Sequence, residues 1–189
     1  TKIGMAGLVG WAALMVSCGE APSEAPEASP SDTRAQEVRG GQVDSTTRGV
    51  VFLYNQQFGS ACSGTLVAPN MVITAQHCIA QTPSSGGGID CNTAPDYGPA
   101  YPASSMLVST QTSAPMTLSG YYGVQGVYTP PSSSQCGGDI AILILSSNVP
   151  ATEATPIAPR LDAVPQINEQ YTVSGFGLDG PQGTSGTRR

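Results

Sequence analysis

Short apolar runs alternate with turn residues along most of the chain. Six runs have the length and composition of β-strands: residues 49–54, 64–68, 71–74, 105–110, 124–128 and 140–145. Pro69 and Asn70 separate the second run from the third, which predicts a hairpin. The last run is apolar at every position and predicts a buried strand. No long segment repeats its apolar residues every 3.6 positions, so the pattern predicts an all-β protein.

Other segments lack this pattern. Ile3–Val16 is an uncharged, largely apolar run, too short to span a bilayer and of the length of an export-signal core. Gly19–Glu37 is rich in Ala, Pro, Ser and Glu, and this composition predicts a disordered tether or propeptide. Between Gln81 and Gln135, Ser, Gly, Pro and Thr predict long surface loops around the two strand-like runs. Pro150–Pro165 predicts a connection without a core pattern.

Composition narrows the function classes. With 189 residues, the chain is long enough for one or two small domains, and its formal net charge of −6 excludes a nucleic-acid-binding surface. Five widely spaced cysteines without a Cys-x-x-Cys pair indicate disulfides in an oxidising compartment rather than a metal site. No calcium site, nucleotide-binding loop or zinc cluster is visible, so we expect no cofactor.

Two positions are candidates for chemistry. His77 is the single histidine of the chain and stands beside Cys78, and Asp139 directly precedes the last apolar run. Taken alone, a histidine beside a cysteine is more often structural or zinc-bound, and an aspartate before a strand more often only caps it. The neighbouring residues favour another interpretation.

The stretch Cys62-Ser63-Gly64-Thr65-Leu66, a turn, and Thr74-Ala75-Gln76-His77-Cys78 resembles the histidine motif of the trypsin/chymotrypsin family of serine proteases. Gln76 stands where that family usually has alanine. Gly138-Asp139-Ile140-Ala141 is similar to the aspartate motif of the family and follows in the expected order. The resemblance implies that His77 is a general base, that Asp139 orients it, and that Cys62 pairs with Cys78.

The resemblance covers residues 38–189 and implies a chymotrypsin-like double antiparallel β-barrel. We expect the first barrel over 38–149, a connection over 150–169 and the start of a second barrel over 170–189. Within the last segment, Gln170–Gly177 is similar to a family strand that ends in Gly-Trp-Gly. The family's Gly-Asp-Ser-Gly-Gly motif, which carries the nucleophile, is absent from these residues. We therefore expect a carboxy-terminally truncated, inactive fragment of a secreted endopeptidase that acts on protein or peptide substrates.

The amino-terminal end contains two further resemblances. Leu14-Met15-Val16-Ser17-Cys18 resembles the lipobox of bacterial lipoproteins, so residues 1–18 predict an export signal and Cys18 a lipidated cysteine; an ordinary cleaved signal is the alternative. Val38-Arg39-Gly40-Gly41 resembles the start of a mature protease, which makes Val38 the expected mature N-terminus. Cys91 and Cys136 then remain and are paired by elimination.

Three functions stay open at this stage. The first is an exported serine endopeptidase, located in the cell envelope or outside the cell and bound to the membrane only through a lipid on Cys18. The second is a protease-like binding or scaffolding lipoprotein that has lost its nucleophile. The third is a β-rich envelope protein with a chance motif, which predicts that His77 and Asp139 lie far apart.

Overall fold

In the computed structural model, residues 41–83, 90–93, 95–131, 134–180 and 183–189 are described, and all belong to one of the two units of the chain, Asp32–Arg189. These residues form six strands, β1 Val50–Asn55, β2 Ser60–Ala68, β3 Met71–Thr74, β4 Met106–Ser109, β5 Tyr122–Tyr128 and β6 Ala141–Leu145. Three single 3₁₀ turns join them, η1 Gln76–Cys78, η2 Ala103–Ser105 and η3 Leu118–Gly120. The all-β prediction is confirmed. The predictions for Cys18 and Val38 lie outside the described residues.

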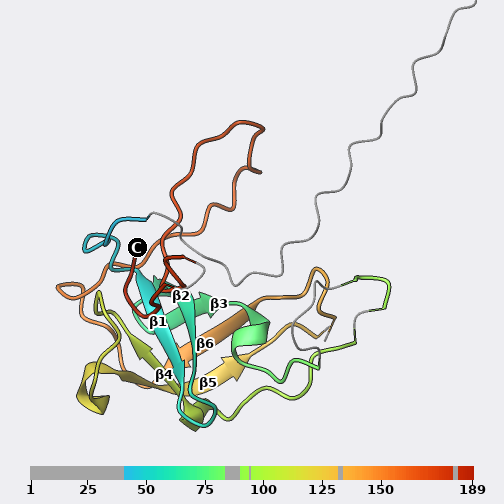
Figure 1. Cartoon of the computed structure of the whole chain (residues 1–189), viewed down its shortest axis with the longest axis horizontal. Helices are drawn as coiled ribbons and strands as arrows, with labels where there is room; N and C mark the ends of the chain where they lie inside the picture. The colour runs from blue at the N-terminus through green and yellow to red at the C-terminus, as the bar shows by residue number, and fades with distance from the viewer. Residues whose placement is uncertain (1–40, 84–89, 94, 132–133, 181–182) are drawn as a thin grey trace, which may run out of the picture. The chain divides into compact units, whose positions relative to one another are not determined.

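The six strands form one closed antiparallel barrel (Figure 1). Their order around the barrel is β1-β2-β3-β6-β5-β4, and β1 closes it by pairing with β4. The predicted hairpin is present as β2 and β3, with Leu66 opposite Val72 and an irregularity before Ala68. Because the barrel is closed, each of its strands has a neighbouring strand on both sides. This architecture is that of one chymotrypsin-like barrel.

Alternate side chains of each strand fill the barrel. On β6, Ala141, Leu143 and Leu145 are buried in the core, whereas Ile142 and Ile144 on the other face are only half-buried. The predicted buried strand is therefore buried on its inner face and half-buried on its outer face. A continuous apolar run can occupy a strand whose second face is only partly covered, because strand side chains point alternately to the two faces.

Glycine is required at one point of the barrel wall. A Cβ atom at Gly64 of β2 would lie 2.7 Å from Leu53 Cδ1 and from Val72 Cγ1. The side chains of the two neighbouring strands thus use the space that a larger residue would need. This glycine belongs to the motif that leads to His77.

The outer face of β1 is covered as well. Val50 and Phe52 pack with Phe176, and the rings of Phe52 and Phe176 meet edge to face with centroids 5.3 Å apart. Beside them lies Arg188, whose side chain is fully buried. Its guanidinium donates to the carbonyl oxygens of Val50 and Thr110 at 2.9 and 3.2 Å. The end of the chain is therefore attached to the barrel.

The segment before Arg188 differs from its prediction. Gln170–Gly177 contains no strand, although Gly175 and Arg189 exchange both backbone hydrogen bonds at 2.9 Å. A strand needs a neighbour to pair its backbone groups, and no strand of the described part of the chain pairs its backbone with this segment. Several apolar side chains of the same region are exposed, namely Leu161, Val164, Ile167 and Tyr171. The second barrel stays a prediction.

Within the described ranges, no helix has the length and apolar character that crossing a membrane requires.

Candidate active site

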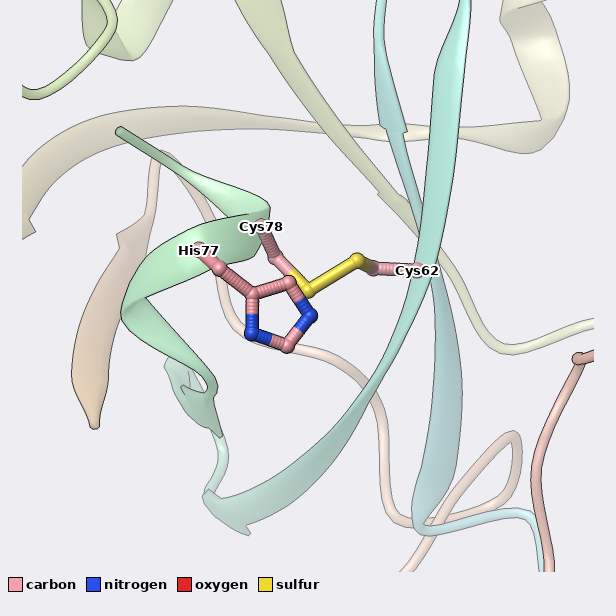
Figure 2. Close-up of side chains that lie close together, drawn as sticks. All are labelled: Cys62, His77 and Cys78. Atoms are coloured by element: carbon pink, nitrogen blue, oxygen red, sulfur yellow. A yellow bond between two sulfur atoms is a disulfide. The ribbon is translucent and has the colours of Figure 1, made fainter. Parts of the chain in front are cut away.

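His77 lies in a short turn that a disulfide connects to a barrel strand. It lies in η1, three residues beyond the end of β3, and the next residue, Cys78, forms a disulfide with Cys62 of β2. Figure 2 shows the imidazole beside this disulfide, on the turn that the sulfur bridge ties to the strand. The backbone of the turn is thus fixed at two points, through the barrel strand β3 and through the sulfur bridge.

The barrel brings Asp139 to the same place. Asp139 lies two residues before β6, and β6 pairs with β3 so that Ala141 stands opposite Thr74. The segment that leads into β6 therefore runs next to the segment that leaves β3. Antiparallel pairing places these two chain ends together, although His77 and Asp139 are 62 residues apart in the sequence.

The two side chains make a two-point contact. Nδ1 of His77 lies 2.8 Å from Oδ2 of Asp139, and the backbone N–H of His77 donates to Oδ1 at 2.9 Å. The side chains remain 46% and 36% exposed, so both border solvent. An ionised carboxylate beside Nδ1 favours the tautomer with the proton on that nitrogen. Nε2 of His77 then carries the lone pair that accepts a proton.

The surroundings keep Asp139 ionised. Burial raises the pKa of its carboxyl, but the hydrogen bonds from the backbone and ring of His77 and from the Tyr97 hydroxyl oppose this and lower the pKa below its ordinary value. The same contact acts in reverse on Tyr97, because burial and the neighbouring carboxylate raise the pKa of its phenol. The acidic member of the pair is therefore charged at neutral pH.

A second disulfide lies close to Asp139. Cys91 is joined to Cys136, three residues before the aspartate. The same two loops are also linked by a hydrogen bond from the Gln135 side-chain amide to the Pro95 carbonyl oxygen. Both links connect the loop that precedes β6 to the loop that follows η1. These loops are the ones that flank the contact between His77 and Asp139.

The cluster of Cys62, His77 and Cys78 is not a metal site in this state. Their potential ligand atoms all lie within 4.8 Å of one another. A zinc ion, however, binds cysteine as thiolate, and the two sulfurs are bonded to each other. The zinc-bound alternative for the histidine therefore lacks its ligands.

The serines near the motifs have other partners. The Ser63 hydroxyl accepts the backbone N–H of Phe176 at 2.9 Å, and its backbone carbonyl accepts the Thr74 hydroxyl at 2.9 Å. The Ser174 hydroxyl donates to Asp44 at 2.9 Å. Both serines thus take part in hydrogen bonds that connect segments of the fold.

Sequence comparison assigns the family. A family model described as Trypsin matches residues 38–189. The chain belongs to the trypsin family of serine proteases. This family hydrolyses peptide bonds, so its members act on proteins or peptides. No curated protein matches this trypsin-family chain. Its two disulfides fit a protein that works in an oxidising compartment outside the cytosol.

Two residues of the site were not singled out in the sequence. Tyr97 stands in a region rich in Gly, Pro and Ser, and nothing in the sequence distinguishes it from the other tyrosines of that region. Gln76 was noted only as a departure from alanine. The structure buries it beside His77, and its Oε1 atom has no hydrogen-bond partner among the described residues.

Proposed function

We propose that this trypsin-family protein is an exported serine endopeptidase in which His77 is the general base and Asp139 orients it. The two-point contact between these residues supports the proposal best. This contact argues against the third function considered from the sequence, a β-rich envelope protein with a chance motif, because that function predicts that the two residues lie far apart. The contact combines a base with a carboxylate that fixes its tautomer, and this pair is what activation of a serine hydroxyl needs.

In this mechanism the serine hydroxyl transfers its proton to Nε2 of His77 as its oxygen attacks the scissile carbonyl. The imidazolium that forms is stabilised by the Asp139 carboxylate, which does not itself take up the proton. His77 then gives the proton to the leaving amine, and the acyl-enzyme is hydrolysed by water through the same two proton transfers. Asp139 acts throughout by holding the ring and its charge.

The proposal assigns the role of nucleophile to none of these 189 residues. The sequence contains no Gly-Asp-Ser-Gly-Gly motif, and Ser63 and Ser174 already have partners within the fold. The proposal is therefore that a further part of the protein supplies the serine together with the oxyanion-binding N–H groups. We expect residues 1–189 alone to have no peptidase activity.

Export and anchoring belong to the same proposal. The apolar run Ile3–Val16 and the lipobox-like residues before Cys18 support secretion followed by lipidation of that cysteine. Lipidation also accounts for an odd number of cysteines, because the other four form two disulfides. Cleavage before Val38 releases the catalytic part, and N-terminal sequencing of the mature protein tests this site.

The experiment compares full-length wild-type protein with the His77→Ala variant in peptide hydrolysis. Gln57→Ala, which changes an exposed side chain at the β1–β2 turn, serves as the matched control. We expect turnover by the wild type and by the control, and a loss of about 10⁴-fold or more in His77→Ala. A correctly folded full-length wild type without turnover favours the alternative, a non-catalytic binding or scaffolding lipoprotein. Equal turnover by wild type and His77→Ala contradicts the assignment of the base.

A further inference from the structure

Cys62, His77 and Cys78 bring three potential ligand atoms for a metal ion together. The two sulfurs and a ring nitrogen all lie within 4.8 Å of one another. In the present state the sulfurs are bonded to each other, whereas a metal ion binds cysteine as thiolate. Reduction of this disulfide turns the cluster into two thiols beside an imidazole, and thiols lose their protons when a metal ion binds.

The fold keeps the two cysteines close together without the help of the sulfur bridge. Cys62 lies on β2 and Cys78 in η1, just after β3, and the two strands pair in the barrel. The Thr74 hydroxyl donates to the Ser63 carbonyl oxygen at 2.9 Å, and the Cys78 N–H donates to the Ala75 carbonyl oxygen at 3.2 Å. The Cα atoms of the two cysteines are 6.0 Å apart. The barrel thus holds both sulfurs within reach of one ion.

Asp139 completes the surroundings of a metal-binding histidine. Nδ1 of His77 lies 2.8 Å from Oδ2 of Asp139, so Nε2 is the nitrogen left for a metal ion. Figure 2 shows that this nitrogen, the one farther from Cβ, is on the side of the ring that faces the disulfide. A metal-ligating histidine usually donates its other ring N–H to a carboxylate, which fixes the tautomer and makes the histidine a stronger ligand. The side chain of His77 is 46% exposed, so an ion can reach it from solvent.

We propose that, once the Cys62–Cys78 disulfide is reduced, the two cysteines and Nε2 of His77 bind a zinc ion, with Asp139 orienting the histidine. A dithiol supplies the two electrons and two protons that open the disulfide, and is itself oxidised to a disulfide. Zn²⁺ then replaces the two thiol protons, which pass to solvent. Sulfur and imidazole ligands suit Zn²⁺, whereas Mg²⁺ and Ca²⁺ prefer oxygen. Three protein ligands leave the fourth tetrahedral position to water.

Zinc at this site prevents the proposed catalysis. The ion takes the lone pair of His77 Nε2, and the proposed mechanism needs this lone pair to accept the proton of the serine hydroxyl. Zinc therefore inhibits peptide hydrolysis by the reduced protein and leaves the oxidised protein active. This inhibition rests on the proposed function, whereas the binding of zinc does not.

The experiment uses the full-length protein, reduced with dithiothreitol and then freed of it under nitrogen. The protein is titrated with Co²⁺, whose visible absorption reports tetrahedral sulfur ligation, and then with Zn²⁺, which displaces the cobalt. Circular dichroism monitors the barrel. We expect the absorption of sulfur-bound Co²⁺ in the reduced wild type and not in the oxidised protein. We expect Asp139→Asn to lower the zinc affinity of the reduced protein about 10- to 100-fold.

Two further variants isolate the site. His77→Ala keeps both cysteines and removes the third ligand, so we expect it to lose the wild-type cobalt spectrum. Cys91→Ser/Cys136→Ser is the matched control, because it removes the other disulfide, to which the single histidine of the sequence belongs in no way that the structure shows. We expect this control to keep the wild-type zinc affinity. In peptide hydrolysis, Zn²⁺ should stop turnover by the reduced wild type, and a chelator should restore it.

The outcomes separate the metal site from the proposed function. A reduced wild type without the cobalt spectrum, folded or unfolded by circular dichroism, overturns the site. Equal zinc affinity of wild type and His77→Ala overturns it as well, and so does a loss of affinity in the control. Wild-type affinity in Asp139→Asn overturns the orienting role of Asp139. If neither redox state hydrolyses peptides, the proposed function fails, whereas the cobalt spectrum still tests the metal site.

Discussion

Asp139 binds His77 twice, once through the ring nitrogen Nδ1 and once through the backbone N–H. The backbone contact does not depend on the rotamer of the histidine. Asp139 therefore keeps its place relative to the turn η1 even when the imidazole moves. The ring contact then forms whenever the side chain returns, which makes the pair a preformed unit of the barrel.

The first prediction concerns this contact. Asn at position 139 keeps the shape of the side chain but removes the charge and lets its amide donate to Nδ1, which favours the wrong tautomer of His77. We expect Asp139→Asn to lower kcat of the full-length protein by about 10⁴-fold, the loss expected when the orienting carboxylate of a Ser-His-Asp triad is neutralised. Steady-state kinetics measure it. Asp162→Asn, which changes an exposed carboxylate, is the control, and a similar loss there would contradict the explanation.

The second prediction concerns acid stability and Asp44. The Thr47 backbone N–H lowers the pKa of this carboxyl most, burial opposes it, and further hydrogen bonds from Thr46, Thr47 and Ser174 lower the pKa well below its ordinary value of 3.8. A group whose pKa is lower in the folded state stabilises the fold above its unfolded pKa and loses this effect as the pH falls through the folded value. The free energy of unfolding should therefore decline below about pH 4.

Asp44→Asn tests this link. We expect the variant to be less stable than the wild type at pH 7 and to show a shallower decline of the free energy of unfolding in acid. Urea unfolding at a series of pH values measures both. Parallel curves for the two proteins between pH 4 and pH 2 would show that Asp44 does not carry the acid sensitivity.

The third prediction concerns the disulfide beside the histidine. Cys62 and Cys78 close a loop with a sequence separation of 16, and a bridge over a loop of this size stabilises a fold by about 3 kcal/mol in the chain-entropy treatment. We expect Cys62→Ala/Cys78→Ala to lose about this much in the free energy of unfolding. Urea unfolding measures the loss. A double variant as stable as the wild type would mean that β3 alone fixes the turn.

The fourth prediction concerns the buried guanidinium of Arg188. Besides Val50 and Thr110, it donates to the Asp44 carbonyl oxygen at 2.9 Å. Lysine keeps the positive charge but lacks the planar guanidinium with its several N–H donors. Some of these three carbonyl oxygens therefore lose their donor. We expect Arg188→Lys to lower the free energy of unfolding by about 2 kcal/mol. Arg160→Lys, at an exposed ion pair with Glu169, should cost less than about 1 kcal/mol. Equal losses of stability in Arg188→Lys and Arg160→Lys would contradict a stabilising role for the hydrogen bonds of the Arg188 guanidinium.

Much of the barrel follows from local pattern. All six strands lie where short apolar runs predict them, because each run needs only a period of two and a turn at its ends. The start of β2 was missed. Ser60 and Ala61 are exposed, and they belong to the strand only because β1 continues opposite them. A strand end that depends on its neighbour leaves no apolar signal in its own residues.

Of the buried and site residues, too, the sequence indicated only some. The flanking motifs singled out His77 and Asp139, which the structure brings into contact, and the two cysteine pairings of the structure are those expected from the sequence. Tyr97 and Arg188 could not be found. An arginine is almost always exposed, and a tyrosine in a Gly-rich loop has no period to place it. Both are buried by contacts between segments that are far apart in the sequence.

The most direct measurement of the central claim maps the residue that a serine-reactive phosphonate modifies in the full-length protein. Mass spectrometry of the labelled peptides should find one modified serine, located outside residues 1–189. Labelling should be lost in His77→Ala and strongly slowed in Asp139→Asn. Modification of Ser63 or Ser174, or labelling that continues unchanged without His77, would contradict the account.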